Sequence, residues 1–346
     1  MEKVSKISKR KNEHLTICLE KKVESRINAG FENISVIHQP LPELDLNQID
    51  TRITFLDKSL NAPLLISSMT GGSLEGARFN TILAEAAEFF QIAMGVGSQR
   101  AAIENPDLED TFKVRKVAPN ILLFANIGAV QLNYGYGVNE VQKAIDMIEA
   151  DAIFLHLNPL QEVLQPEGNT HFSGLLSKIE RICKSIKTPV FVKEVGCGIG
   201  AHTARLLFDA GVSGIDCAGL GGTSWALVEA ERHLDSQMAA LARKFGDWGI
   251  PTVSCLLDYR KHDLTKNIIA SGGIRSGVDV FKSIALGAQL AGMALPFLRA
   301  ANQGSKSLQV FIESIIQELK VTMFNAQTAT IEDIDISTIQ FEERSC

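Results

Sequence analysis

A short apolar run followed by a helical pattern recurs eight times along this chain. The apolar runs cover residues 63–68, 92–97, 121–128, 152–158, 190–196, 214–218, 268–272 and 290–295. Segments with apolar residues at three- and four-residue spacing lie between them, for example 77–90, 174–185, 201–210 and 278–286. Strands that alternate with helices pair in parallel, and eight such units can close the sheet. The sequence therefore predicts an α/β fold, specifically a (β/α)8 TIM barrel.

The first 60 residues lack this alternation. They are polar and irregular, with a helical pattern over 9–23 and a strand pattern over 34–38. We expect residues 1–60 to form an N-terminal extension that packs on the barrel and contributes to its substrate site, and residues 61–346 to form the barrel. The stretch 223–248 is long enough for an inserted loop and one helix.

Composition limits the function classes. The net charge of the 346-residue chain is −6, which disfavours a broad basic face for nucleic acid. No apolar run reaches membrane-spanning length, and no apolar signal core follows the charged N-terminus. The cysteines are scattered, which favours reduced thiols and a cytoplasmic location. They are Cys18, Cys183, Cys197, Cys217, Cys255 and Cys346.

The loop after the seventh apolar run is typical of an anion site. A β-branched run ends at Gly272 and Gly273, Arg275 follows, and a helix is expected from about Val278. Glycines let the backbone approach a ligand, and we expect the free N–H groups of the following helix to face an anion. The two glycines could instead form only a turn, but Arg275 favours phosphate. Barrels commonly bind phosphate with the loops after strands seven and eight.

Polar residues recur where the predicted strands end. The positions are Met69–Gly72, Gly97–Arg100, Asn126, His156, Asn158, Lys193 and the stretch 219–223. Each one alone is compatible with a local turn or a hydrogen-bonded core residue. Because the carboxyl ends of barrel strands meet at one face, where barrel enzymes carry their active sites, the coincidence predicts a site there.

Lys193 lies in an otherwise apolar strand, between Phe191 and Val195 on the same face. A buried ammonium requires a negative or electron-rich partner. A flavin meets this need, since a cation near N1 and O2 favours the anionic reduced ring. The alternative is a Schiff-base lysine, as in barrel aldolases. The many glycines suited to a flat cofactor favour the flavin.

A second anion site is indicated by Arg10 and Lys11 together with Arg100 in the loop after the second strand. Gln161 and Glu162 follow the fourth strand, near the expected barrel mouth. A single carboxylate with neighbouring amides suits Mg²⁺, which keeps waters and shares ligands with substrate phosphates. The pattern predicts a diphosphate bound opposite a flavin.

Eight motifs together resemble one family. They are RKNEH at 10, MTGG at 69, GSQR at 97, HLNPLQE at 156, QPEG at 165, VKEVG at 192, GGTSWA at 221 and SGGIRSG at 271. The chain resembles type 2 isopentenyl diphosphate isomerase, an FMN-dependent barrel enzyme, over nearly its whole length. SGGIRSG is shared with other FMN barrels, whereas HLNPLQE, RKxxH and GGTSWA are specific to this family.

The resemblance implies roles for individual residues. FMN would be held by Met69, Thr70, Gly71, Ser98, Asn126, Lys193, Thr223, Gly273, Arg275, Ala294 and Leu295. The substrate diphosphate would be bound by Arg10, Lys11, His14, Ser98, Arg100, His156, Asn158 and Gln161. Glu162 would be the Mg²⁺ ligand, and Lys193, Gln161 and Glu229 would be catalytic.

The resemblance also implies a reaction, the 1,3-allylic proton shift that interconverts isopentenyl and dimethylallyl diphosphate in isoprenoid biosynthesis. Reduced FMN would act as acid and base, Mg²⁺ would hold the diphosphate, and NADPH would only reduce the flavin. A homo-oligomer, a tetramer or octamer, is expected on the same grounds.

Three other functions fit parts of this pattern. An FMN-dependent α-hydroxy-acid oxidase would carry a histidine after the sixth strand, where this chain has Cys217 and glycines. A barrel dehydrogenase acting on purine nucleotides would need a nucleophilic cysteine in a loop, and no cysteine has that setting. A flavin-binding protein without catalysis would not need Gln161 and Glu162.

Overall fold

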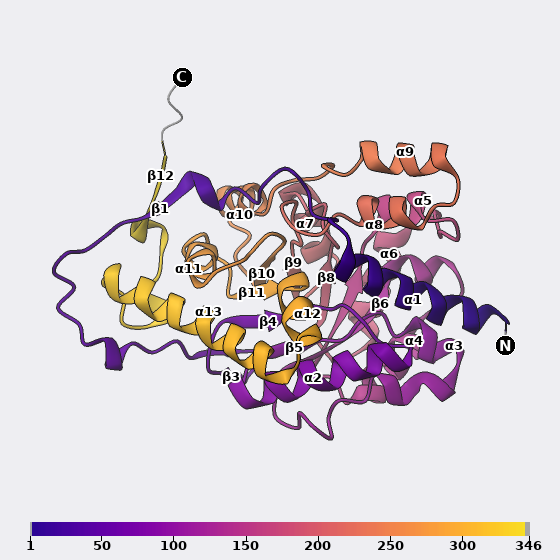
Figure 1. Ribbon diagram of the computed structural model, residues 1–346, viewed down its shortest axis with the longest axis horizontal. Coiled ribbons are helices and arrows are strands. Elements are labelled where there is room, and N and C mark those ends of the chain that lie inside the picture. The colour runs from indigo at the N-terminus through magenta and orange to yellow at the C-terminus, as the bar shows by residue number, and fades with distance from the viewer. Residues whose placement is uncertain (1, 343–346) are drawn as a thin grey trace.

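The fold is a closed barrel of eight parallel strands (Figure 1). The computed structural model describes residues 2–342, with side chains from Lys9 onward. The barrel strands are β4 (Leu64–Ile66), β5 (Ala93–Gly95), β6 (Leu123–Gly128), β7 (Ala152–His156), β8 (Val190–Lys193), β9 (Gly214–Asp216), β10 (Ile268–Ser271) and β11 (Leu290–Met293). They pair in the order β10-β11-β4-β5-β6-β7-β8-β9. The predicted TIM barrel and all eight predicted strands are confirmed.

Aromatic side chains fill one end of the barrel. Phe124 and Phe154, on neighbouring strands, stack with ring centroids 4.4 Å apart, and Phe191 meets both edge-on. A hairpin of β2 (Ile53–Phe55) and β3 (Lys58–Leu60) adds Phe55, whose ring lies 6.0 Å from Phe191. This apolar cluster closes the amino ends of the strands. The carboxyl ends remain available for a site.

Thirteen helices lie within residues 2–342. They are α1 (Glu2–Glu20), α2 (Leu74–Phe90), α3 (Arg100–Glu104), α4 (Val138–Ile148), α5 (Pro159–Leu164), α6 (Leu175–Ser185), α7 (Ala201–Asp209), α8 (Trp225–Arg232), α9 (Ser236–Lys244), α10 (Thr252–Lys261), α11 (Gly277–Ala285), α12 (Leu295–Asn302) and α13 (Ser305–Asn325). None of those described is long and apolar enough to cross a membrane.

Two helix predictions were wrong in detail. The predicted helix over 9–23 runs instead from Glu2 to Glu20. It ends early because Val23 and Glu24 pair with the loop before α8. The Ser224 N–H donates to the Val23 carbonyl, and Glu24 forms an antiparallel β-bridge with Thr223. The stretch 223–248 holds two helices rather than one, since Asp235 caps a second helix, α9, by accepting from the Gln237 N–H.

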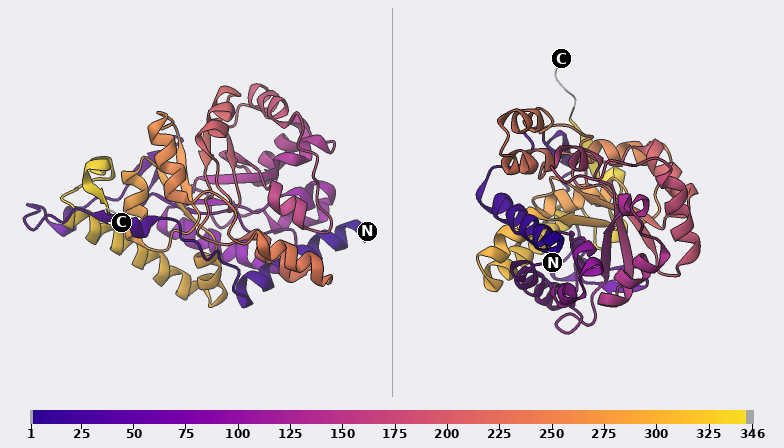
Figure 2. Two further views of the ribbon diagram at one scale, coloured as in Figure 1. Left: turned by 90° about the horizontal axis from the view of Figure 1, so that it is seen from above. Right: turned by 90° about the vertical axis from the view of Figure 1, so that its right-hand side faces the viewer.

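A short segment before the barrel pairs with the last strand of the described chain, away from the start of α1 (Figure 2). β1 (Ile34–Val36) pairs antiparallel with β12 (Ile339–Phe341), so the predicted strand over 34–38 forms but ends at Val36. Helix α1 contacts α2, α3, α8 and α12 and lies beside the open end of the barrel. The first five cysteines have free thiols, and Cys346 lies outside the described residues.

Candidate active site

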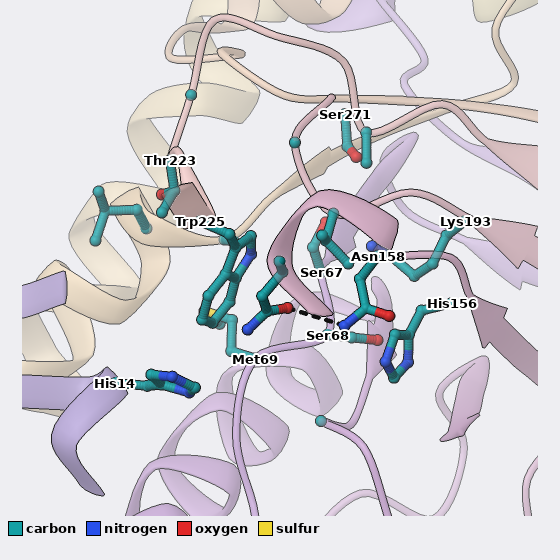
Figure 3. Close-up of a pocket in the computed structure, with 18 of the residues that line it drawn as sticks. His14, Ser67, Ser68, Met69, His156, Asn158, Lys193, Thr223, Trp225 and Ser271 are labelled. Atoms are coloured by element: carbon teal, nitrogen blue, oxygen red, sulfur yellow. Dashed lines mark hydrogen bonds between the residues drawn. The ribbon is translucent and has the colours of Figure 1, made fainter. Parts of the chain in front are cut away.

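A cavity opens at the carboxyl ends of the barrel strands (Figure 3). Its wall combines strand ends and the loops after them with residues of α1, α5 and the start of α12. The sequence-predicted residues that line it are Arg10, Lys11, His14, Met69, Thr70, Ser98, Arg100, Asn126, His156, Asn158, Gln161, Glu162, Lys193, Thr223, Gly273, Arg275, Ala294 and Leu295. The structure thus brings the two predicted anion sites into one cavity.

Two predicted residues lie behind the cavity wall. Gly71 has φ of 135°, and a Cβ there would lie 2.1 Å from the ring of Phe112. Its role in the structure is close packing that shapes the loop after β4. Glu229 is fully buried on α8 and reaches the cavity through its partners His14 and Gln161.

The anion site predicted from the stretch 268–277 differs from the prediction in the helix N-terminus that faces it. The N–H groups at the start of the following helix are not free for an anion as predicted, because Ser276 and Asp279 form a capping box at the N-terminus of α11 and Glu318 accepts from the Gly277 N–H. On this side, the start of α12 at Ala294 and Leu295 lines the cavity without a side-chain cap. An anion here meets the Gly273 loop and the positive end of α12.

Arg275 extends the same anion site toward the surface. Its guanidinium donates to Glu24 at 3.5 Å, and Arg299 donates to both oxygens of the same carboxylate at 3.2 and 3.0 Å. Burial lowers the pKa of Arg275, and Glu24 opposes that fall. One carboxylate thus holds two arginines in place beside the site.

The cavity wall across the barrel from β10 and β11 carries His156 of β7 and Asn126 of β6. The Nδ1 of His156 lies 2.7 Å from Asn126 Oδ1, so the ring donates through Nδ1. Burial, followed by the charges of Lys193 and Lys11, lowers the pKa of His156 to about 3. The imidazole is therefore neutral at pH 7, and the positive charge on this wall comes from lysine and arginine.

Helix α1 supplies two cations to the cavity. Lys11 donates from Nζ to the Ser98 carbonyl at 2.7 Å and lies over the ring of Phe112, 4.7 Å from its centroid. Burial and the neighbouring Arg10 lower the pKa of Lys11 to about 7. Arg10 has a lowered pKa for the same first reason, burial. Among the described side chains no carboxylate forms an ion pair with either cation, and two such desolvated cations are well suited to an incoming polyanion.

The pKa of Lys11 gives a testable pH dependence. Below about pH 7 the ammonium is charged, and above it the free protein loses this charge, so we expect the KM for a diphosphate substrate to rise by up to about tenfold per pH unit above 7. Lys11→Arg is the matched control, because its charge persists to high pH. Initial rates from pH 6 to 9 test this, and an equal rise in both proteins would contradict it.

A hydrogen-bonded chain crosses the mouth from α1 to α5. Glu229 Oε1 accepts from His14 Nε2 and from Gln161 Nε2, both at 3.0 Å. Asn158 Nδ2 donates to Gln161 Oε1 at 3.0 Å and to Glu162 Oε1 at 3.1 Å. Burial acts to raise the pKa of Glu229, but the bonds from His14 and Gln161 and the charge of Arg232 lower it to about 2. Glu229 is therefore ionised and fixes the Gln161 amide.

Arg232 joins three separate segments at this mouth. It donates to Glu229 on its own helix at 2.6 Å, to Glu13 of α1 at 3.1 Å and to Glu167 of the loop after α5 at 3.3 Å. Its side chain is only 6% exposed and that of Glu229 is fully buried, so this pair is shielded from solvent, whereas Glu13 and Glu167 are 39% and 51% exposed. This network was not predicted from the sequence. It fixes α1 beside the cavity.

The carboxylate of Glu162 is surrounded by amide donors. Gln165 Nε2 donates to Oε2 at 2.6 Å, and the Asn169 N–H donates to the same oxygen. Beside it, Asn158 Oδ1 is buried and has no hydrogen-bond partner in the described structure. No group of three or more His, Cys, Asp or Glu residues among those described could hold a metal by itself. A cation here would need oxygen ligands from substrate or water, as Mg²⁺ allows.

Buried polar atoms without partners also mark a cofactor position. In the described chain, the hydroxyls of Ser67, Ser68 and Thr70 are buried without a hydrogen-bond partner, and all three residues line the cavity. Such atoms are rare unless a ligand completes them. Together with Lys193 and the Gly273 loop they fit a flat ring with polar edges and a phosphate, which is the chemistry of FMN.

Sequence reasoning missed several residues of this region. Ser67 and Ser68 fell within a predicted strand end and were not singled out, and Gln131 and Gln165 also line the cavity. Asp216, a buried acid in the sixth barrel strand, was missed as well. The sequence does contain a signal for Asp216, because this ionisable residue lies in an otherwise apolar strand, as Lys193 does.

A family model and solved structures of similar fold match this chain. The FMN-dependent dehydrogenase family matches residues 156–341. A flavocytochrome b2 variant superposes with a TM-score of 0.69 at 17% identity, covering 95% of this chain and 82% of its own. A soluble variant of (S)-mandelate dehydrogenase from Pseudomonas putida gives 0.67 at 16% identity, covering 99% of both chains. At these identities the likeness shows the fold.

Sequence relatives decide the family. An isopentenyl-diphosphate delta-isomerase from Nostoc sp. is 50% identical over 326 residues, covering 94% of this chain and 93% of its own. The chain belongs to the isopentenyl-diphosphate delta-isomerase family. A family member from Rickettsia canadensis is 46% identical, covering 96% of this chain and 97% of its own. Membership in this isomerase family confirms the resemblance inferred from the motifs.

Proposed function

We propose that this protein interconverts isopentenyl diphosphate and dimethylallyl diphosphate by a 1,3-allylic proton shift, with FMN, Mg²⁺ and the diphosphate in the cavity described above. The observation that carries the proposal is the union of two anion sites in one cavity. The Gly273 loop and the start of α12 form one, and Arg10, Lys11 and Arg100 form the other. A flavin phosphate and a substrate diphosphate need two such sites.

The first site would hold FMN. The loop at Gly273, the uncapped start of α12 and Arg275 would bind the phosphate, while Thr70, Ser98, Asn126 and Thr223 would bind the polar edges of the ring. When bound and reduced, FMN supplies the acid and base for the proton shift. Lys193 would favour this state by placing an ammonium beside the ring.

The second site would bind the diphosphate. Arg10, Lys11 and Arg100 supply charge, and the neutral His156 with Asn158 and Gln161 supplies hydrogen-bonding groups. Glu162 would bind Mg²⁺, with remaining ligands from the diphosphate and water. Glu229, held ionised by its neighbours, would keep the Gln161 amide oriented toward the reacting carbons.

The apolar part of the substrate would be shielded by α1 and α8. The rings of His14 and Trp225 meet edge to face with centroids 5.0 Å apart at the cavity wall (Figure 3). An aromatic wall excludes water and stabilises the tertiary cation that protonation of the alkene forms. NADPH as reductant, a tetrameric or octameric assembly and a cytoplasmic location complete the proposal.

The decisive experiment varies only the state of the flavin. Protein with oxidised flavin should bind isopentenyl diphosphate with Mg²⁺ yet isomerise it about a hundredfold or more slowly than reduced protein, since acid–base catalysis is worth that much. NADPH or dithionite without oxygen should restore the rate, with no reductant consumed per turnover. Product formation and binding are measured on the same samples. Equal rates in both states would overturn the proposal.

A further inference from the structure

Asp216 is a buried carboxylate to which the proposed reaction gives no role. It is 0% exposed, lies at the end of β9, and is the register partner of Lys193 on the neighbouring strand β8. Its Oδ1 accepts from Ser271 Oγ at 2.6 Å and from the Ala218 N–H at 3.2 Å. Its Oδ2 has no hydrogen-bond partner in the described structure and lies 3.8 Å from Lys193 Nζ.

The other carboxylate near Lys193 is directed elsewhere. Glu194 uses Oε2 to accept from three successive N–H groups, those of Val195, Gly196 and Cys197. Lys193 Nζ donates to the Glu194 backbone carbonyl, not to its carboxylate. Asp216 is therefore the acid that the Lys193 ammonium faces across the strand pair.

We propose that Asp216 is a positioning residue that holds the Lys193 ammonium at the cavity, and that the opposed charges of this pair together set the reduction potential of the bound flavin. This rests on the proposed function, in which Lys193 lies beside the flavin ring. A buried ammonium requires a compensating charge, and Asp216 supplies one from a rigid strand. Ser271 fixes Asp216 in turn, so the arrangement spans three adjacent barrel strands.

The direction in which the charge of Asp216 shifts the reduction potential of the flavin follows from electrostatics. A negative charge near the ring disfavours the anionic reduced flavin, and the Lys193 ammonium favours it. Burial raises the pKa of Asp216, and Lys193 opposes this rise, so the ionised form of Asp216 depends on the pair. The two residues should therefore shift the potential in opposite directions, and the two shifts should nearly cancel when both side chains are replaced.

The test measures the midpoint potential of the flavin in the holoenzyme against a reference dye, without substrate. Asp216→Asn should raise the ratio of reduced to oxidised flavin about tenfold at fixed potential, which is about 30 mV for a two-electron couple. Lys193→Met should lower the ratio about tenfold, and the double variant should return within about threefold of the parent. Asp216→Glu, which keeps the charge, should remain close to the parent.

Asp151→Asn is the matched control. This substitution also removes a carboxylate that pairs with a lysine, Lys58. Because that pair lies at the amino end of the barrel, the flavin potential of this variant should equal that of the parent. An unchanged potential in Asp216→Asn, with Lys193→Met shifted, would overturn the role of Asp216 alone. An unchanged potential in Lys193→Met would instead contradict the proposed flavin position. If Asp216→Asn fails to retain flavin, Ser271→Ala should give a smaller shift of the same sign, and no shift there would overturn the proposal.

Discussion

Replacing Gly273 by aspartate is expected to lower the affinity for FMN by at least about a hundredfold, because the new side chain brings both strain and a repelling charge. Gly273 has φ of 78°, and a Cβ there would lie 2.6 Å from Ala29 Cβ and 2.7 Å from the Gly221 carbonyl oxygen. The loop would have to move away from Ala29 and Gly221. The carboxylate would then face the phosphate that the loop and the start of α12 are proposed to hold.

Gly273→Ala is the control for this result. It carries the same Cβ and the same strained backbone without the charge, so the difference between the two variants reports the repulsion alone. Arg275→Ala removes the guanidinium and should weaken FMN about tenfold, since Arg299 remains nearby. Fluorescence titration of stripped protein with FMN measures all three. Unchanged affinity in both Gly273→Asp and Arg275→Ala would contradict the phosphate site.

The barrel could be predicted from the sequence because parallel strands buried on both faces appear as continuous apolar runs. All residues of β8 and β10, for example, are buried. The pairing of β1 with β12 could not be predicted, since Ile34 and Phe341 are distant in sequence and both strands are short. The local pattern near Ile34 indicates a strand but carries no information about its partner.

The cavity residues were predictable for a related reason. Strand ends in a parallel barrel converge on one face, so Asn126, His156 and Lys193 share a cavity whatever the loops between them do. The position of α1 was not predictable in this way. It depends on ion pairs such as Arg232 with Glu13 and on the chain leaving the helix at Val23, which are tertiary contacts without a local signal.

The capping of α11 illustrates a different limit. A glycine loop before a helix indicates an anion site, yet Ser276 and Asp279 fit the capping-box spacing equally well. The two interpretations use the same N–H groups and exclude each other. The structure favours the cap, and α12 provides the open helix start because Ala294 and Leu295 carry no capping oxygen.

Replacing Glu162 by glutamine is expected to raise the Mg²⁺ concentration needed for half-maximal isomerisation on the order of ten- to a hundredfold. An amide keeps nearly the same size but loses the charge that attracts a hard cation. Gln165, Asn169 and Asn158 all donate to the Glu162 carboxylate. The NH2 group of the new glutamine would therefore face at least one of these donors, and this repulsion should lower the rate independently of Mg²⁺.

The dependence on Mg²⁺ separates these two effects. A lost ligand is partly restored by added Mg²⁺, whereas a misplaced donor is not, so rates are measured across a wide range of Mg²⁺ for the parent and the variant. Glu167→Gln is the matched control: it lies in the same segment, is 51% exposed and contacts Arg232, so its Mg²⁺ dependence should equal that of the parent. If Glu162→Gln also shows the parental half-saturation, Glu162 binds no metal, and its carboxylate serves only to hold Asn158 and the following loop.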